Sequence, residues 1–169
     1  MRVKTGLGIL AGLAFVGGPA EATTTTAQFG VQLQINAECV INSTATLDFG
    51  SAGVLGGAAG TTNTDQPSTL QVQCTNTTPY NIGLDAGQTT GGAVSQRLLF
   101  NSGTNATIKY NLYTNAGRST IWGNTVGTDT VAATGSGATQ SYTIYGRVPP
   151  QTTPAPATYS DTITVTITY

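Results

Sequence analysis

Histidine is absent from all 169 residues of the chain. Without it, neither a Ser-His-Asp nor a Cys-His catalytic arrangement can form, and the most common metal-binding side chain is missing. Charged residues make up only 8% of the sequence, against about a quarter in a typical soluble protein. These shortages argue against an enzyme, and they predict that the protein uses no metal or other cofactor.

The few charges that exist are scattered along the chain. From residue 23 onward, four basic residues oppose six acidic residues, and they form no basic patch and no acidic run. Because nucleic-acid binding depends on a basic surface, we expect no nucleic-acid partner. Asp48, Asp85 and Asp161 each lie beside turn-forming residues, where carboxylates ordinarily accept hydrogen bonds from nearby backbone. We therefore do not expect them to form a catalytic carboxylate pair.

The first 22 residues have the pattern of an export signal. Arg2 and Lys4 precede an apolar stretch over residues 7–16, and Ala20 and Ala22 form a small-x-small cleavage site. The apolar stretch is shorter than the roughly 20 residues that a membrane-spanning helix needs. We therefore expect residues 1–22 to be removed during export, leaving a mature chain of residues 23–169.

Two cysteines, Cys39 and Cys74, follow the expected signal. In an oxidising compartment an even number of cysteines indicates a disulfide. Closing a loop of this length would stabilise the fold by roughly 3–4 kcal/mol. Two buried free thiols are the less favoured alternative.

Alternating apolar and polar residues, separated by clusters of Gly, Asn and Pro, predict a single all-β domain. The expected strands are residues 27–35, 45–49, 69–74, 80–84, 108–113, 141–148 and 162–169. The expected loops are residues 53–66, 86–95, 123–137 and 149–157. We expect the proline-rich segment 149–157 to cross between two sheets, since it favours an extended backbone. Trp122 and the tyrosines of the strands are expected to be packing residues.

The first and the last expected strands have the clearest alternation. In the first, one face carries Ala27, Phe29, Val31, Leu33 and Ile35. In the last, one face carries Ile163, Val165, Ile167 and Tyr169, and four threonines occupy the other. Residues 27–35 begin soon after the expected cleavage site, and nine extended residues span roughly 30 Å. Periodicity alone favours an ordinary first strand of the same sandwich, whereas an open sheet edge would favour donation of this strand.

Short motifs in order along the mature chain resemble the spore coat U family, which includes subunits of archaic chaperone–usher pili. The first are Cys39, Leu47-Asp48-Phe49-Gly50, Val72-Gln73-Cys74-Thr75, Pro79-Tyr80, Leu84-Asp85-Ala86-Gly87 and Arg97. The later ones are Tyr110-Asn111-Leu112-Tyr113, Ile121-Trp122-Gly123, Tyr142-Thr143-Ile144-Tyr145-Gly146-Arg147-Val148, Tyr159-Ser160-Asp161-Thr162 and Val165-Thr166-Ile167-Thr168-Tyr169. Each motif is weak alone, but their order and spacing together are specific.

This resemblance implies an incomplete immunoglobulin-like sandwich that lacks its last strand. A periplasmic chaperone would hold the subunit, and an outer-membrane usher would pass it into a fibre of identical or homologous subunits outside the cell. The N-terminal strand of the next subunit would fill the gap, with Phe29, Val31, Leu33 and Ile35 as plugs. Ile163, Val165 and Ile167 would help to line the acceptor groove.

The resemblance leaves two roles open. The first is a stalk subunit of an attachment or biofilm fibre, and the second is a coat protein or tip adhesin with the same fold. A tip adhesin requires a further receptor domain and no donor strand, so the predicted single domain with its N-terminal strand favours the stalk role. Sequence alone does not separate a coat protein from a pilus subunit.

Overall fold

The computed structural model describes residues 17–19 and 21–169. The basic start and the apolar stretch of the expected export signal lie outside the described residues. The chain divides into two units, Met1–Gln34 and Ile35–Tyr169. Described residues of the first unit form neither helix nor strand. The second unit contains the folded domain.

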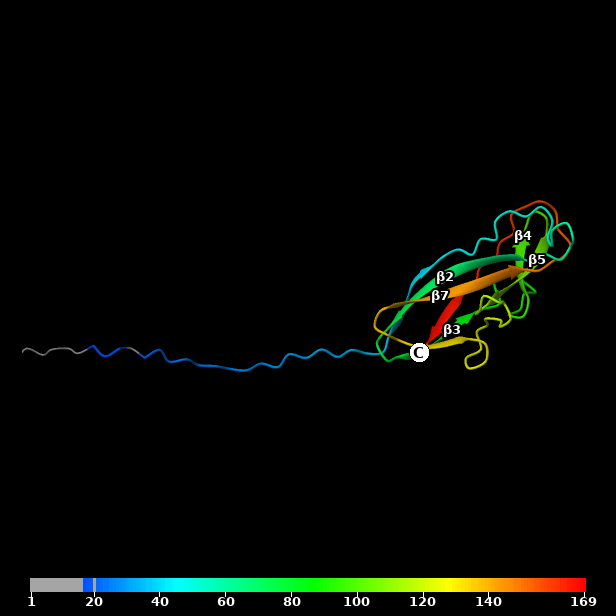
Figure 1. Ribbon diagram of the computed structural model, residues 1–169. Helices are drawn as coiled ribbons and strands as arrows, with labels where there is room; N and C mark the ends of the chain where they lie inside the picture. Colours follow the sequence, from blue (N-terminus) through cyan, green and yellow to red (C-terminus); the bar gives the residue numbers. More distant parts are fainter. Residues whose placement is uncertain (1–16, 20) are drawn as a thin grey trace, which may run out of the picture. The chain divides into compact units, whose positions relative to one another are not determined.

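The folded domain is a two-sheet β structure (Figure 1). Its strands are β1 (Cys39–Thr44), β2 (Thr64–Cys74), β3 (Pro79–Leu84), β4 (Arg97–Asn101), β5 (Ala106–Tyr113), β6 (Val131–Thr134), β7 (Thr139–Val148) and β8 (Val165–Thr168). One sheet has the order β1-β2-β7-β5-β4 and the other β6-β3-β8, and all pairs are antiparallel. Within the described part of the chain there is no helix, and hence none that could cross a membrane. The all-β prediction is confirmed.

Most of the predicted strands are present with small changes of length. The predictions at 69–74, 80–84, 108–113 and 141–148 fall within β2, β3, β5 and β7, and the prediction at 162–169 shortens to β8. The predicted loop 53–66 is wrong at its end, because β2 already begins at Thr64. The predicted loop 123–137 contains β6. The proline-rich segment connects β7 of one sheet to β8 of the other, as predicted.

The strand predicted at residues 45–49 does not form, although its side chains alternate as expected. Leu47 and Phe49 are half-buried and their neighbours are exposed. Of the backbone in this segment, Ala45 N donates to Thr69 O at 2.9 Å, after which no ladder continues. A regular strand requires a hydrogen-bonded partner along its length. The alternation of apolar and polar residues therefore identified the buried side chains of this segment correctly. It did not show whether the backbone pairs with another strand.

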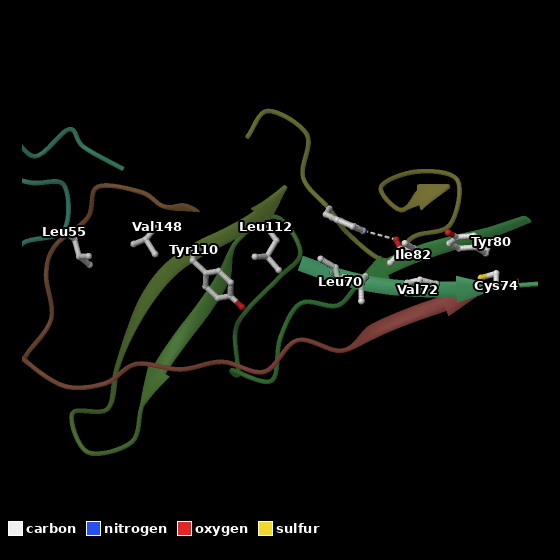
Figure 2. Packing of buried hydrophobic residues seen from close by; sticks show 11 residues of the cluster. Leu55, Leu70, Val72, Cys74, Tyr80, Ile82, Tyr110, Leu112 and Val148 are labelled. Atoms are coloured by element: carbon white, nitrogen blue, oxygen red, sulfur yellow. Dashed lines mark hydrogen bonds between the residues drawn. The ribbon is translucent and has the colours of Figure 1, made fainter. Parts of the chain in front are cut away.

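The core lies between the sheets and combines residues of both (Figure 2). Along β2 the inward positions Leu70, Val72 and Cys74 alternate with more exposed residues, as a strand with one buried face requires. Trp122 is 1% exposed, and its indole N–H donates to Ile82 O at 2.8 Å. The packing role expected for Trp122 is confirmed.

The disulfide prediction is also confirmed. Cys39 and Cys74 are bonded, and they face each other as the first pair of the β1–β2 ladder. The bond therefore fastens the start of an edge strand to the end of an interior strand.

Arg97, the first residue of β4, is fully buried. Its guanidinium donates to the carbonyl oxygens of Leu84 at 2.9 Å and Trp122 at 2.8 Å, and to Asn111 Oδ1 at 2.7 Å. It also donates to the carbonyl oxygens of Asp85 at 2.8 Å and Val94 at 3.3 Å. A buried charge is costly unless its donors are satisfied. Here the guanidinium joins β3, β4 and β5 by satisfying backbone carbonyls that no strand pairs.

We predict that Arg97→Met lowers the free energy of unfolding by at least about 3 kcal/mol, because it leaves several buried acceptors without a donor. Chemical denaturation followed by tryptophan fluorescence measures this change, since Trp122 is in the core. Lys109→Met, at an exposed position of β5, is the matched control and should change stability by less than about 0.5 kcal/mol. Equal effects of the two substitutions would contradict the role of Arg97.

Candidate functional site

β8 is an edge strand of the three-stranded sheet, paired with β3 on one side only among the described residues. Just before β8, Asp85 N donates to Thr164 O at 3.1 Å, so the backbone of Thr164 faces β3. Backbone direction alternates along an antiparallel strand. The N–H and C=O groups of Val165 and Ile167 therefore point to the open edge.

Side chains of this last segment alternate in the same register. Ile163, Val165 and Ile167 are half-buried against the core, and the threonines between them are exposed. The predicted shared face of these three residues is therefore present. Tyr169 is 59% exposed and does not pack on the core.

The alternating segment begins well before β8 itself. Ser160 exchanges two backbone hydrogen bonds with Phe100 of β4, at 2.9 and 3.1 Å. Tyr159 and Asp161 are half-buried, whereas Ser160 and Thr162 are exposed. Residues 159–167 thus form one extended segment with a paired side and an open side. Nine residues of extended chain span roughly 30 Å.

Residues 46–55 lie across a cavity from the start of this segment. The cavity is about 660 Å³ in volume, and its lining includes Leu47, Phe49, Ile108, Val148 and Tyr159. About half of the lining residues are apolar, and the polar ones include Asp48 and Asp161. The groove therefore adjoins the start of the last segment, and its lining does not include Ile163, Val165 or Ile167, which the sequence predicted to line an acceptor groove.

Gly146 of β7 leaves room for Leu47 and Phe49, two residues that line the groove. A Cβ at Gly146 would approach Leu47 Cδ1 to 2.7 Å and Phe49 Cζ to 2.9 Å, which is closer than real Cβ contacts. The Phe49 ring in turn contacts Tyr110 edge-on, with a centroid distance of 6.2 Å. The glycine lets two large side chains pack directly on the sheet.

Asp48 and Asp85 accept hydrogen bonds from the backbone N–H two residues later, as predicted, whereas Asp161 accepts from a distant loop and from a tyrosine. Asp161 Oδ1 accepts from Gln88 N at 2.9 Å and Thr89 N at 3.1 Å, and Asp161 Oδ2 accepts from the Tyr110 hydroxyl at 2.8 Å. Burial, together with this bond to a carboxylate, raises the pKa of Tyr110. Among the described residues, no group of acids and cysteines is arranged to hold a metal ion.

The apolar arm, defined as residues 27–35, is not part of a β-strand in the described chain. Its large apolar side chains are Phe29 at 86% exposure, Val31 at 86%, Leu33 at 84% and Ile35 at 74%. Ala27 is exposed as well. The predicted strand is therefore not formed in the isolated chain, because a β-strand exists only with a partner. Four large exposed apolar side chains in one short segment indicate a surface that another surface covers.

Fold and groove together define a class: an all-β sandwich with an open strand edge at β8 and a partly apolar groove at the start of the last segment, preceded by an exposed apolar segment. The chain belongs to the Spore Coat Protein U domain family, whose model matches residues 25–166. This confirms the resemblance found in the sequence. The matched range includes the apolar arm.

Two similar proteins add detail. The chain is 34% identical over 160 residues to Protein U of Myxococcus xanthus, covering 89% of this chain and 88% of that protein. Among solved structures, it resembles a chain in the pre-assembly complex of the CsuC chaperone with the CsuE tip adhesion subunit, from the archaic chaperone–usher Csu pili of Acinetobacter baumannii. That match has a TM-score of 0.56 and 25% identity and covers 80% of this chain. The chain spans 40% of the matched one.

Acid should weaken the attachment of β8 to the sheet through Asp85. Burial works to raise the pKa of Asp85, but hydrogen bonds from Thr164 and Gly87 outweigh it and hold the pKa below its usual value. A lowered pKa means that this stabilisation is complete above the ordinary carboxyl pKa, about 4, and is lost as the pH falls below it.

We therefore predict that amide exchange at Thr166 and Thr168, whose backbone groups face β3, accelerates below about pH 4 relative to strands of the other sheet. Asp85→Asn should exchange faster at neutral pH and lose most of this acid dependence. Asp48→Asn, whose carboxylate accepts only from Gly50 in the neighbouring turn, is the matched control. An unchanged acid profile in Asp85→Asn would contradict the assignment.

Proposed function

We propose that this protein is an exported subunit of an extracellular chaperone–usher fibre, assembled by donation of its apolar arm to the groove of a neighbouring subunit. The observation that carries the proposal is the match between two unsatisfied features. The open edge at residues 159–167 has nine residues, and the apolar arm has nine residues, five of which face one side. A strand added at that edge satisfies both.

The donated arm pairs through its backbone and anchors through its side chains. Main-chain N–H and C=O groups of Val165 and Ile167 point to the open edge and accept a new strand there. Phe29, Val31 and Leu33 recur at every second position and enter the groove from one face of the arm. Burying each large apolar side chain contributes about 1.5–3 kcal/mol, so four of them favour a long-lived joint.

Before assembly, a subunit with an open apolar groove requires protection from aggregation. The family and the similarity to a subunit in a chaperone pre-assembly complex support a periplasmic chaperone as the first partner, with an outer-membrane usher as the second. In this scheme residues 1–22 direct export, residues 23–36 form the donor segment and residues 37–169 form the sandwich. The assembled fibre lies outside the cell and mediates attachment and biofilm formation.

A surface coat is the second candidate, because the similarity to Protein U of Myxococcus xanthus covers most of both chains. An adhesive tip module is a third candidate, because the similar chain comes from a complex of a chaperone with a tip adhesion subunit. Genes for a chaperone and an usher beside this gene favour the fibre. Electron microscopy of secreted material separates filaments from an amorphous coat.

Charged substitutions on the inner face of the arm should block assembly. We predict that Phe29→Asp or Leu33→Asp abolishes fibres, because a carboxylate in an apolar groove is costly. Gln28→Asp and Gln32→Asp, at alternate positions of the same arm, are the matched controls and should still assemble. Fibre yield is measured by negative-stain electron microscopy and by sedimentation of polymers from shed material. Loss of fibres in both sets would point to a general effect of charge and against the donated-strand model.

Removing the donor should leave the acceptor intact. We predict that a chain without residues 23–35 remains bound to the chaperone, does not polymerise, and binds a synthetic peptide of residues 27–35. Fluorescence anisotropy of the labelled peptide measures binding, and the same peptide with Leu33→Asp is the control. Fibres formed by the truncated chain would refute donation by the arm.

A further inference from the structure

Residues 36–38, which we call the arm root, connect the apolar arm to β1, and Asn36 and Glu38 of the root form hydrogen bonds with Thr75. Thr75 N donates to Glu38 O at 2.9 Å, and Glu38 N donates to Thr75 Oγ1 at 3.1 Å. The single proton of the Thr75 hydroxyl lies within reach of Asn36 O and Glu38 O, each at 3.2 Å from Oγ1. The next pair along the chain is the disulfide between Cys39 and Cys74. The root is therefore fastened by hydrogen bonds and, immediately after them, by a covalent bond.

Thr75 is itself fixed to turns that connect strands of both sheets. Its carbonyl accepts from Thr78 N at 3.1 Å within the β2–β3 turn. In the β6–β7 turn, Gly135 packs so closely that a Cβ there would overlap the Thr75 carbonyl. Gly135 also donates to Thr78 O at 2.7 Å and accepts from Thr77 N at 2.8 Å. A pull on Thr75 is thus shared between strands of the two sheets.

The strand that follows the root, β1, has few other contacts besides its ladder with β2, the disulfide and the hydrogen bonds of Thr75. β1 is an edge strand paired only with β2, its ladder is interrupted between Ile41 and Ser43, and five of its six residues are exposed. Tension applied at its first residue would break the ladder one pair at a time. The disulfide joins that first pair, so separation of β1 from β2 cannot begin there while the bond is intact.

We propose that the arm root is a tension-bearing joint, in which the Cys39–Cys74 bond and Thr75 pass a pull on the arm to β2 and the adjoining turns instead of to β1. This rests on the proposed function, because only a donated arm transmits tension between subunits. The disulfide supplies the strength of the joint. Thr75 holds the root against the sandwich and opposes the first step of separation when the disulfide is open.

The test uses fibres of the full chain, assembled oxidised and held at constant force in optical tweezers. We expect no early extension step before reduction. Dithiothreitol added to the held fibre should then produce an early step per subunit of at most roughly 20 Å as residues 36–46 leave β2, because these residues span about 36–40 Å when fully extended and the strand β1 already spans about 20 Å of that. Reducing an assembled fibre avoids any failure of a cysteine variant to fold.

In the reduced fibre, Thr75→Val should make this step about tenfold faster, the change expected for loss of about one hydrogen bond. Thr75→Ser keeps the hydroxyl and should behave as the unmodified chain. Thr69→Val, at an exposed position of β2, is the matched control and should leave the rate unchanged.

Two results would overturn the joint: reduced fibres without an early step, or equal rates for Thr75→Val and Thr69→Val. If all variants assemble into normal fibres but show equal rates of the early extension step, the joint is rejected. Donation of the arm to a neighbouring subunit would not be contradicted by that result. Absence of fibres from the unmodified chain rejects the proposed function itself.

Discussion

Unpaired backbone along the last extended segment is the constraint on which the rest of the molecule depends. The N–H and C=O groups of Val165 and Ile167 face an edge that no strand of the described chain covers. Their side chains nevertheless pack on the core, so the edge is held rigidly in strand form. An open strand edge of this kind offers unpaired backbone groups to another extended chain. This edge is the acceptor that we propose for the donated arm.

Charged residues are scarce in this protein, and several of them hold strands together. Arg97 donates to the carbonyl oxygens of Leu84 and Asp85 at the end of β3 from a fully buried position. On the outer side, Asp65 of β2 accepts two hydrogen bonds from Arg147 of β7, at 2.8 and 2.7 Å, and these bonds hold the pKa of Asp65 below its usual value. The apolar part of the groove lining, which includes Leu47, Phe49 and Val148, suits uncharged side chains of a donated arm.

Alternation of apolar and polar residues in the sequence predicted the strands that have one face on the core. It failed for strands whose buried or exposed residues do not follow that alternation. β2, β3, β5, β7 and β8 were found from the sequence, because each has one face on the core. β4 was missed since its inward residue is Arg97, and a charged residue is almost never fully buried without partners. β1 was missed because nearly all of it is exposed, and β6 because it is short and lies in a glycine-rich segment. The disulfide was predictable from export and cysteine number alone.

The site was only partly accessible from the sequence. Alternation identified the half-buried faces at Leu47 and Phe49 and at Ile163 to Ile167, but which strand edges stay unpaired depends on contacts between residues far apart in the chain. The role of Gly146 was likewise hidden, because it appears only where two side chains from another segment cross β7. The hydrogen bonds of the arm root to Thr75 had no local signal at all.

The arm root bears on whether a subunit could fill its own groove. Cys74 ends β2 at the same end of the sandwich as Thr168, because the turn after Cys74 leads into β3, where Asn81 pairs with Thr168. An arm returning from this end would lie parallel to β8, the less stable pairing mode. Its last plug, Ile35, is joined to Cys39 by three residues that must also cross about 10 Å between sheets. Two of these residues, Asn36 and Glu38, already form hydrogen bonds with Thr75, so self-insertion would break the root contacts. Donation to a neighbour keeps them and allows the antiparallel direction, which is why we favour assembly over self-closure.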